Sequence, residues 1–317
     1  MTRRLLAAGT VLALATGMVV AAMQAGEPVC TDTECTVTVT LPRPSPIVSP
    51  SPYPVPGPTV TVTRTVTVAP DGRQLVWSDE FDGDTLDSRI WGARREGRDG
   101  NQFASCDVPE NVRVADGHLL LIARRETATC AGGTRQWTTG AVYSDGRMLL
   151  PPEGALEIRA LIPVSSPQHV GIWVAAWTRA SSGWGEMDLF ESGGGAARWD
   201  RIIHAVHHDY NAVGYGNRWV ERISGPYQPG WHVYRLEWGK GSAKWYVDGK
   251  EVWSVTPSTT PWMAEAVSGA QHWLRLSLQL PGPSLTRWYG DPAQNPQIDQ
   301  PGESVTARFD YVRVWSS

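Results

Sequence analysis

Short stretches in which apolar and polar residues alternate dominate the chain from residue 73 onward, and they restrict the folds open to it. Residues 155–162 and 231–238 alternate with a period of two, as strands do. Asp248-Gly249 separates residues 244–247 from 251–255, and Asp-Gly between two such runs is a strong hairpin signal. We see no long helical periodicity in this part. Many antiparallel strands predict an all-β fold, a sandwich or jelly roll of two antiparallel sheets.

The first 72 residues have a different composition, because all 16 tryptophans lie at or after position 77. Residues 1–25 carry Thr2-Arg3-Arg4 before an apolar run that ends in small residues, which predicts a signal peptide or a retained N-terminal membrane anchor. Residues 26–72 are rich in Pro, Thr, Val and Ser, which predicts a disordered, extended linker. Residues 59–63 alternate like a strand but lack an apolar partner face, so we expect a stalk. Residues 73–317 then form the globular domain.

Charge and cysteine content narrow the function and the compartment. The net charge of −4 gives no electrostatic case for a nucleic-acid partner. Four cysteines and the export signal fit a secreted, extracellular protein, held at the cell surface if the anchor is retained. Cys106 and Cys130 can form a disulfide between two early loops, and Cys30 and Cys35 can close a small ring; free thiols are the alternative. No Cys-His pattern has zinc spacing.

Three carboxylates, Glu186, Asp188 and Glu191, lie in one short apolar segment with uneven spacing. In a flat strand Glu186 and Asp188 share a face and Glu191 does not, but one extra residue, a β-bulge, returns Glu191 to that face. Grouped carboxylates raise one another's pKa, which suits an enzyme needing one ionised and one protonated acid. A solvated edge strand and a calcium site are the alternatives. Nearby tryptophans favour a sugar-binding cleft.

The chain resembles glycoside hydrolase family 16, whose motif is Glu-x-Asp-x-(x)-Glu, here in its bulged form. Six segments carry the resemblance in the family's order, and they cover roughly residues 73–317: residues 75–83, residues 109–119, Trp173 with Trp177, residues 186–191, the His204-Ala-Val-His207 pair, and residues 309–315. Two loops depart from the family pattern. Residues 280–290 replace a Gly-Gly-x-Trp-Pro-Gly loop, and residues 99–103 replace an Asn-rich loop.

The resemblance implies a jelly-roll fold and a retaining mechanism. Glu186 is then the nucleophile, Glu191 the general acid and base, and Asp188 the residue that hydrogen-bonds Glu186. Trp184 and Trp173 are expected to line the cleft, with His207 near the carboxylates and Asn101 as a further substrate contact. His204 has the same parity as His207 only after a bulge, so it is expected less than His207 to face the cleft, and a core histidine is the alternative for both.

The resemblance also implies one structural calcium ion, with Glu80, the backbone of Gly117 and Asp310 as its ligands. Ion pairs of Glu80 and Asp310 with arginines are the alternative. No cofactor is expected for catalysis, and the protein is expected to act as a monomer.

The expected function is hydrolysis of internal β-glycosidic bonds in a polysaccharide, most closely β-1,3-glucan of the laminarin type. A galactan of the agar or carrageenan type is a second candidate substrate, because the 280–290 loop is unusual. A non-catalytic, lectin-like domain is a third reading, against which all three carboxylates argue. A metal-dependent hydrolase that uses these acids as ligands is a fourth.

Overall fold

The computed structural model of the chain describes residues 71–181, 185–193, 195–208, 219–264 and 270–317, together with the backbone of four strands nearer the N-terminus. The chain divides into two compact units, Met1–Leu75 and Val76–Ser317. Among the described residues, no helix is both long and apolar enough to cross a membrane. The apolar run of residues 5–22 lies outside the described residues, so the signal or anchor remains a prediction.

The N-terminal unit contains four strands: β1 (Gln24–Ala25), β2 (Val29–Cys30), β3 (Glu34–Pro42) and β4 (Thr59–Thr67). The backbones of β3 and β4 pair antiparallel along their whole length, from Glu34 opposite Thr67 to Pro42 opposite Thr59. The predicted strand-like alternation of residues 59–63 thus has a partner strand that the sequence did not identify, because two β-branched, alternating Thr-Val segments pair with each other, while the stalk stays a prediction. Cys30 and Cys35 are backbone partners in β2 and β3, as the predicted small ring requires.

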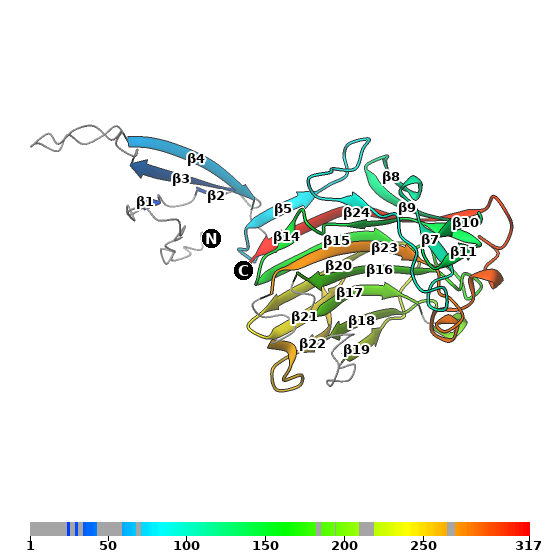
Figure 1. Cartoon of the computed structure of the whole chain (residues 1–317). Helices are drawn as coiled ribbons and strands as arrows, with labels where there is room; N and C mark the ends of the chain where they lie inside the picture. The colour runs from blue at the N-terminus through cyan, green and yellow to red at the C-terminus, as the bar shows by residue number, and fades with distance from the viewer. Residues whose placement is uncertain are drawn as a thin grey trace, which may run out of the picture. The chain divides into compact units, whose positions relative to one another are not determined.

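The C-terminal unit is a sandwich of two sheets, which Figure 1 shows as two layers of strands. The ten-stranded sheet contains β5 (Leu75–Asp79), β7 (Ser105–Asp107), β8 (Val112–Ala115), β9 (His118–Arg124), β12 (Trp137–Thr139), β15 (Gly154–Leu161), β20 (Trp231–Gly239), β21 (Ser242–Val247), β22 (Lys250–Val255) and β24 (Ser304–Ser316). The eight-stranded sheet contains β6 (Gly92–Ala93), β13 (Ala141–Tyr143), β14 (Leu149–Leu150), β16 (Trp173–Ala180), β17 (Glu186–Ser192), β18 (Ile202–His207), β19 (Trp219–Ser224) and β23 (His272–Gln279).

The predicted all-β sandwich is confirmed, with one difference in the pairing. Among the described strand pairs whose register is defined, β12 with β7 runs parallel, at the edge of the ten-stranded sheet, and the others within the two sheets are antiparallel. A short hairpin, β10 (Ala128–Cys130) with β11 (Gly133–Arg135), lies outside both sheets. The helical segments of the described chain are one turn each: η1 (Pro109–Asn111), η2 (Ala196–Arg198), α2 (Thr286–Tyr289) and η3 (Pro292–Gln294).

The apolar faces of the two sheets pack against each other. Along β15 the residues at 156, 158 and 160 are fully buried, which follows the period-two pattern of the sequence. Phe190 of β17 meets Tyr234 of β20 across the interface, with ring centroids 4.2 Å apart. This packing fixes β17, so that the side chains on its other face point away from the core.

The predicted hairpin at Asp248-Gly249 is confirmed. Both residues have positive φ, 50° and 75°, which suits a tight turn between β21 and β22. The predicted disulfide is confirmed as well: Cys106 of β7 is bonded to Cys130 of β10. It ties the short hairpin to the edge of the ten-stranded sheet.

Candidate active site

The predicted bulge lies in β17, between Asp188 and Glu191. Opposite β16, Ala176 pairs with Phe190 and Trp177 with Asp188, so Leu189 is the extra residue. Opposite β18, three steps along β17 from Asp188 to Glu191 match two steps from Ala205 to Ile203. The bulge therefore restores Glu191 to the face that carries Glu186 and Asp188, as the sequence predicts.

Two side chains from the core hold the bulge in place. The Nδ1 atom of His204 lies 2.7 Å from the carbonyl oxygen of Leu189, and Trp245 Nε1 donates to the carbonyl oxygen of Asp188 at 2.8 Å. The other nitrogen of His204 lies 2.8 Å from Ser224 Oγ. Burial lowers the pKa of His204 to about 4, so the ring stays neutral and its Nδ1–H donates to Leu189. His204 is thus a core histidine, the alternative that the sequence left open.

A cavity of about 290 Å³ opens on the face that carries the three carboxylates. Its floor comes from alternate residues of three neighbouring strands: Glu186, Asp188 and Glu191 of β17, Trp173, Ala175, Trp177 and Arg179 of β16, and Arg275 and Gln279 of β23. The loop residues Arg98, Gln102 and Phe103 form one wall. The period-two geometry of the strands is therefore what collects these side chains.

Burial raises the pKa of two of the three carboxylates. Burial raises the pKa of Asp188 to about 8, opposed by its hydrogen bond with Glu186 and by the nearby Arg179. Burial also raises the pKa of Glu191 well above its ordinary value, with repulsion from Asp188 as the second cause. The grouping of the acids in the sequence predicts repulsion as the cause of the raised pKa of Glu191, whereas burial is the larger effect in the structure. Glu191 therefore holds its proton more tightly than an exposed glutamate does, as a general acid must.

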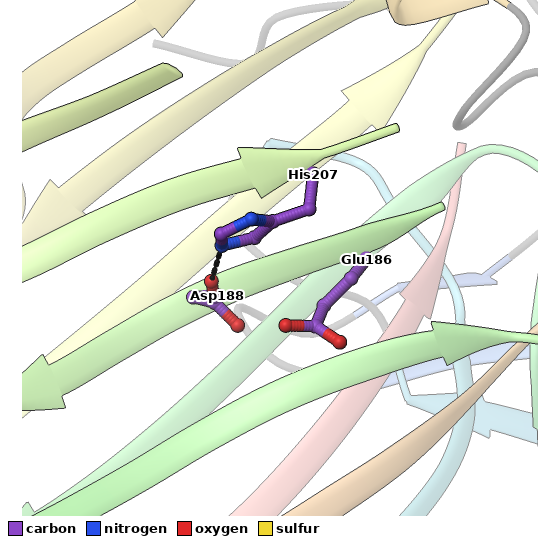
Figure 2. Close-up of side chains that lie close together, drawn as sticks. All are labelled: Glu186, Asp188 and His207. Atoms are coloured by element: carbon purple, nitrogen blue, oxygen red, sulfur yellow. Dashed lines mark hydrogen bonds and ion pairs between the residues drawn. The ribbon is translucent and has the colours of Figure 1, made fainter. Parts of the chain in front are cut away.

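Two basic side chains contact the acids directly. His207 Nε2 lies 3.1 Å from Asp188 Oδ2, and Figure 2 shows the imidazole and the two carboxylates of Asp188 and Glu186 grouped together. Arg179 Nη1 lies 3.3 Å from Glu186 Oε2. Burial lowers the pKa of His207, which favours its neutral form beside these acids. His207 is placed at the site, as expected.

Trp173 contacts the acid rather than standing open as a platform for sugar. Its Nε1–H donates to Glu191 Oε1 at 2.8 Å. Its ring is stacked by Tyr289 of α2, with centroids 4.3 Å apart, and by Phe103, with centroids 5.8 Å apart. Trp173 therefore lines the cavity as predicted, but neighbouring aromatic rings occupy much of the surface that a sugar would stack on.

Two predicted substrate contacts, Trp184 and Asn101, are not found at the cavity among the described residues. Trp184 lies outside the described residues, so its role stays a prediction. Asn101 is exposed, and its carbonyl oxygen accepts from the N–H of Ser284 at 2.9 Å. Among the described residues it is Gln102 and Phe103, and not Asn101, that line the cavity. Asn101 thus joins the two unusual loops, because the 99–103 loop is bonded to the 280–290 loop.

Several residues that line the cavity are not predicted from the sequence. Arg179, Arg275 and Gln279 share the cavity face through strand parity alone, a signal that becomes readable once β16 and β23 are paired. Arg275 is held by Asp145 at 3.0 and 2.5 Å and lies over the ring of Trp177. Trp219 of β19 is stacked near His207, with centroids 6.1 Å apart, and is 47% exposed.

The expected calcium ligands do not fit a metal site. Both oxygens of Glu80 accept from Arg313, at 3.0 and 2.8 Å. Asp310 accepts from Arg159 at 2.6 Å, and its second oxygen lies 3.7 Å from His118 Nε2. Gly117 lies in the turn between β8 and β9, with φ of 73°. Arginine side chains already bind the carboxylate oxygens of Glu80 and Asp310 that a calcium ion would need. These ion pairs are the alternative to a calcium site that the sequence left open.

Among the described residues, Glu186, Asp188 and His207 form a group whose ligand atoms lie within 4.8 Å of one another. A divalent ion accepts such donors, but these donors already satisfy one another and Arg179. Asp188 is paired with His207, and Glu186 lies against the Arg179 guanidinium. The arrangement matches a carboxylate site for acid–base chemistry without requiring an ion.

Comparison with known proteins agrees with this geometry. The family model for glycosyl hydrolases family 16 matches residues 109–290, more than half of the chain. Glucan endo-1,3-beta-glucosidase A1 of Niallia circulans is 27% identical over 218 residues, 58% of this chain and 30% of that protein. Beta-glucanase of Rhodothermus marinus is 31% identical over 192 residues, 55% of this chain and 63% of that protein. The chain thus spans less than two thirds of either relative.

A solved structure supports the same assignment. The catalytic domain of an endo-1,3-beta-glucanase (laminarinase) from Thermotoga petrophila RKU-1 is similar with a TM-score of 0.62 and 25% identity, over 77% of this chain and 98% of that one. With the bulged Glu186–Glu191 segment and its cavity, these matches show that the chain belongs to glycosyl hydrolase family 16.

Proposed function

We propose that the protein hydrolyses internal β-glycosidic bonds of a polysaccharide with retention of configuration. The observation that carries this proposal is the bulge in β17, which brings Glu186, Asp188 and Glu191 into one cavity, where burial raises the pKa of Glu191. A retaining glycosidase needs one ionised carboxylate and one carboxylic acid, about 5 Å apart across the scissile bond. Two carboxyl groups on one face of a bulged strand suit that requirement.

In this proposal Glu186 attacks the anomeric carbon, while Glu191 gives its proton to the departing glycosidic oxygen. The bond between carbon and that oxygen breaks, and a glycosyl-Glu186 ester forms. Glu191, now ionised, then removes a proton from water, which attacks the ester and releases the sugar. Asp188 positions Glu186 through their hydrogen bond, and His207 in turn contacts Asp188. Arg179 stabilises the negative charge on Glu186.

We propose β-1,3-glucan as the substrate class. Support comes from the printed activities of the relatives, a glucan endo-1,3-β-glucosidase and a laminarinase. The loop at 280–290 differs from the family pattern and supplies Tyr289 to the aromatic cluster around Trp173. A galactan substrate is the second candidate, because this loop borders the cavity.

We also propose that the protein acts outside the cytoplasm. The basic residues Arg3 and Arg4 before an apolar run support export. The Cys106–Cys130 disulfide fits an oxidising compartment.

The test is reducing-sugar release by the purified protein from laminarin, mixed-linkage β-glucan, agarose and carrageenan, with Glu186→Gln as the control. The proposal expects release from laminarin that Glu186→Gln abolishes. Release from agarose or carrageenan alone would replace the glucan with a galactan. Binding without release from any polysaccharide would refute the enzyme and favour a lectin. Loss of activity with a chelator, restored by a divalent ion, would favour the metal-dependent hydrolase.

A further inference from the structure

Gln279, at the end of β23, carries a polar atom that the protein leaves unpaired. The residue is 3% exposed and lines the cavity that holds the three carboxylates. Its Nε2 donates to Ser277 Oγ at 2.7 Å. Its Oε1 is buried and has no hydrogen-bond partner among the described residues. A buried amide oxygen without a partner lowers the stability of a fold, so its retention in a cavity needs a reason.

Turning the amide over does not remove the unpaired atom. Ser277 Oγ already accepts from Trp177 Nε1 at 3.2 Å, and its own hydrogen can be donated to one acceptor. If the amide oxygen faced Ser277, it would accept that hydrogen, and the NH₂ group would then face the cavity without a partner. In either orientation one polar half of Gln279, a residue that lines the cavity, lacks a partner among the described residues.

The surroundings of Gln279 place it beside the reacting groups. In the pairing of β16 with β23, Gln279 lies opposite Trp173, the residue that donates to Glu191. Phe103, whose ring stacks on Trp173, pairs with Pro281 in an isolated bridge two residues beyond Gln279. The amide is thus buried beside the residue that contacts Glu191, and in a buried place a hydrogen bond to a ligand is stronger than one in water.

We propose that Gln279 determines specificity by accepting a hydrogen bond from a hydroxyl group of the bound sugar, in a subsite next to the catalytic acids. This inference rests on the proposed function. A hydroxyl is the matching group, because it donates to an amide oxygen and accepts from an amide NH₂, so either orientation of Gln279 is satisfied. A sugar whose hydroxyl at this position is absent or methylated leaves the amide unpaired and is rejected.

The variant Gln279→Met tests the proposal, because it keeps the side-chain length and removes the polar atoms. Gln297→Met is the matched control: Oε1 of Gln297 is also buried without a partner, but among the described residues Gln297 is not one that lines the cavity. Binding of laminaritetraose is measured by calorimetry in the Glu186→Gln background, and KM and kcat for laminarin are measured with Glu186 intact. Thermal unfolding is measured for every variant.

The proposal expects Gln279→Met to weaken binding of laminaritetraose and to raise KM by about tenfold, the effect of one lost hydrogen bond. It expects Gln297→Met to bind as the parent does, and neither variant to be less stable than the parent. Unchanged affinity and KM in Gln279→Met would overturn the proposal while laminarin hydrolysis still stood. If the parent neither binds nor cleaves β-1,3-glucan, the proposed function fails, and thermal unfolding then tests the role of Gln279. A Gln279→Met variant less stable than the parent would show that Gln279 has a structural role and would overturn the subsite as well.

Discussion

The hydrogen bond from His204 to the bulge gives a prediction about pH and stability. His204 is fully buried between Leu189 and Ser224, and its pKa is lowered to about 4 from 6.5. Below pH 6.5 the unfolded chain binds a proton at this residue that the folded protein does not. Stability therefore falls as the pH drops from 6.5 toward 4, and this residue has no effect above about pH 7. Each pKa unit is worth about 1.4 kcal/mol, and the unfolded histidine is half protonated at pH 6.5, so lowering the pH from about 7.5 to 5 costs about 2 kcal/mol.

The test is chemical denaturation of the parent and of His204→Leu between about pH 7.5 and pH 5. At the higher pH the variant should be less stable by about 1–3 kcal/mol, because the buried carbonyl of Leu189 loses its donor. At pH 5 that deficit should shrink by about 2 kcal/mol, since only the parent carries the histidine penalty. Other titrating groups are common to both proteins and cancel. A stability difference that stays constant with pH would refute a neutral, buried His204.

Three further predictions concern the site and the fold. The N–H of Trp173 donates to Glu191 and lowers the pKa of Glu191, so Trp173→Phe should raise that pKa and move the basic limb of the pH profile of kcat/KM to higher pH. An unmoved limb would contradict the acid role of Glu191. The half-exposed ring of Trp219 offers a face for a sugar, so Trp219→Ala should raise KM for laminarin by about fivefold with little change in kcat. An unchanged KM would exclude a contact between this ring and the sugar. A chelator should leave the midpoint of thermal unfolding unchanged, because arginines pair with Glu80 and Asp310; a clear drop would restore the calcium site.

Much of the fold was predictable because strand parity and turn residues are local signals. The period-two runs at β15 and β20 and the Asp248-Gly249 turn identify strands without knowledge of their partners. The pairing of β3 with β4 was missed, because each segment by itself lacks an apolar face and only the partner strand shows why it is extended. The parallel pair of β7 and β12 was missed because register between distant strands leaves no trace in a short segment.

The site shows the same division between local and non-local information. The spacing of Glu186, Asp188 and Glu191 predicts the bulge, because parity within one strand is enough. The raised pKa of Glu191 depends mainly on burial, which the packing of the surrounding elements creates, so its main cause was not visible in the sequence. Gln279 and Arg275 reach the cavity only through the pairing of β23 with β16. Asn101 was misplaced by one position, since Gln102 and Phe103 of the same loop line the cavity.

The central claim is that Glu186 is the nucleophile of a retaining β-1,3-glucanase. The most direct measurement uses a laminaribiose derivative with fluorine at C2 and a good leaving group at C1, which slows the second step so that the glycosyl-enzyme accumulates. If Glu186 is the nucleophile, the protein gains the mass of one disaccharide unit, mapped by peptide mass spectrometry to Glu186 and absent in Glu186→Gln. An adduct on a different residue, or turnover of laminarin with no adduct and with inversion at the anomeric carbon, would contradict it.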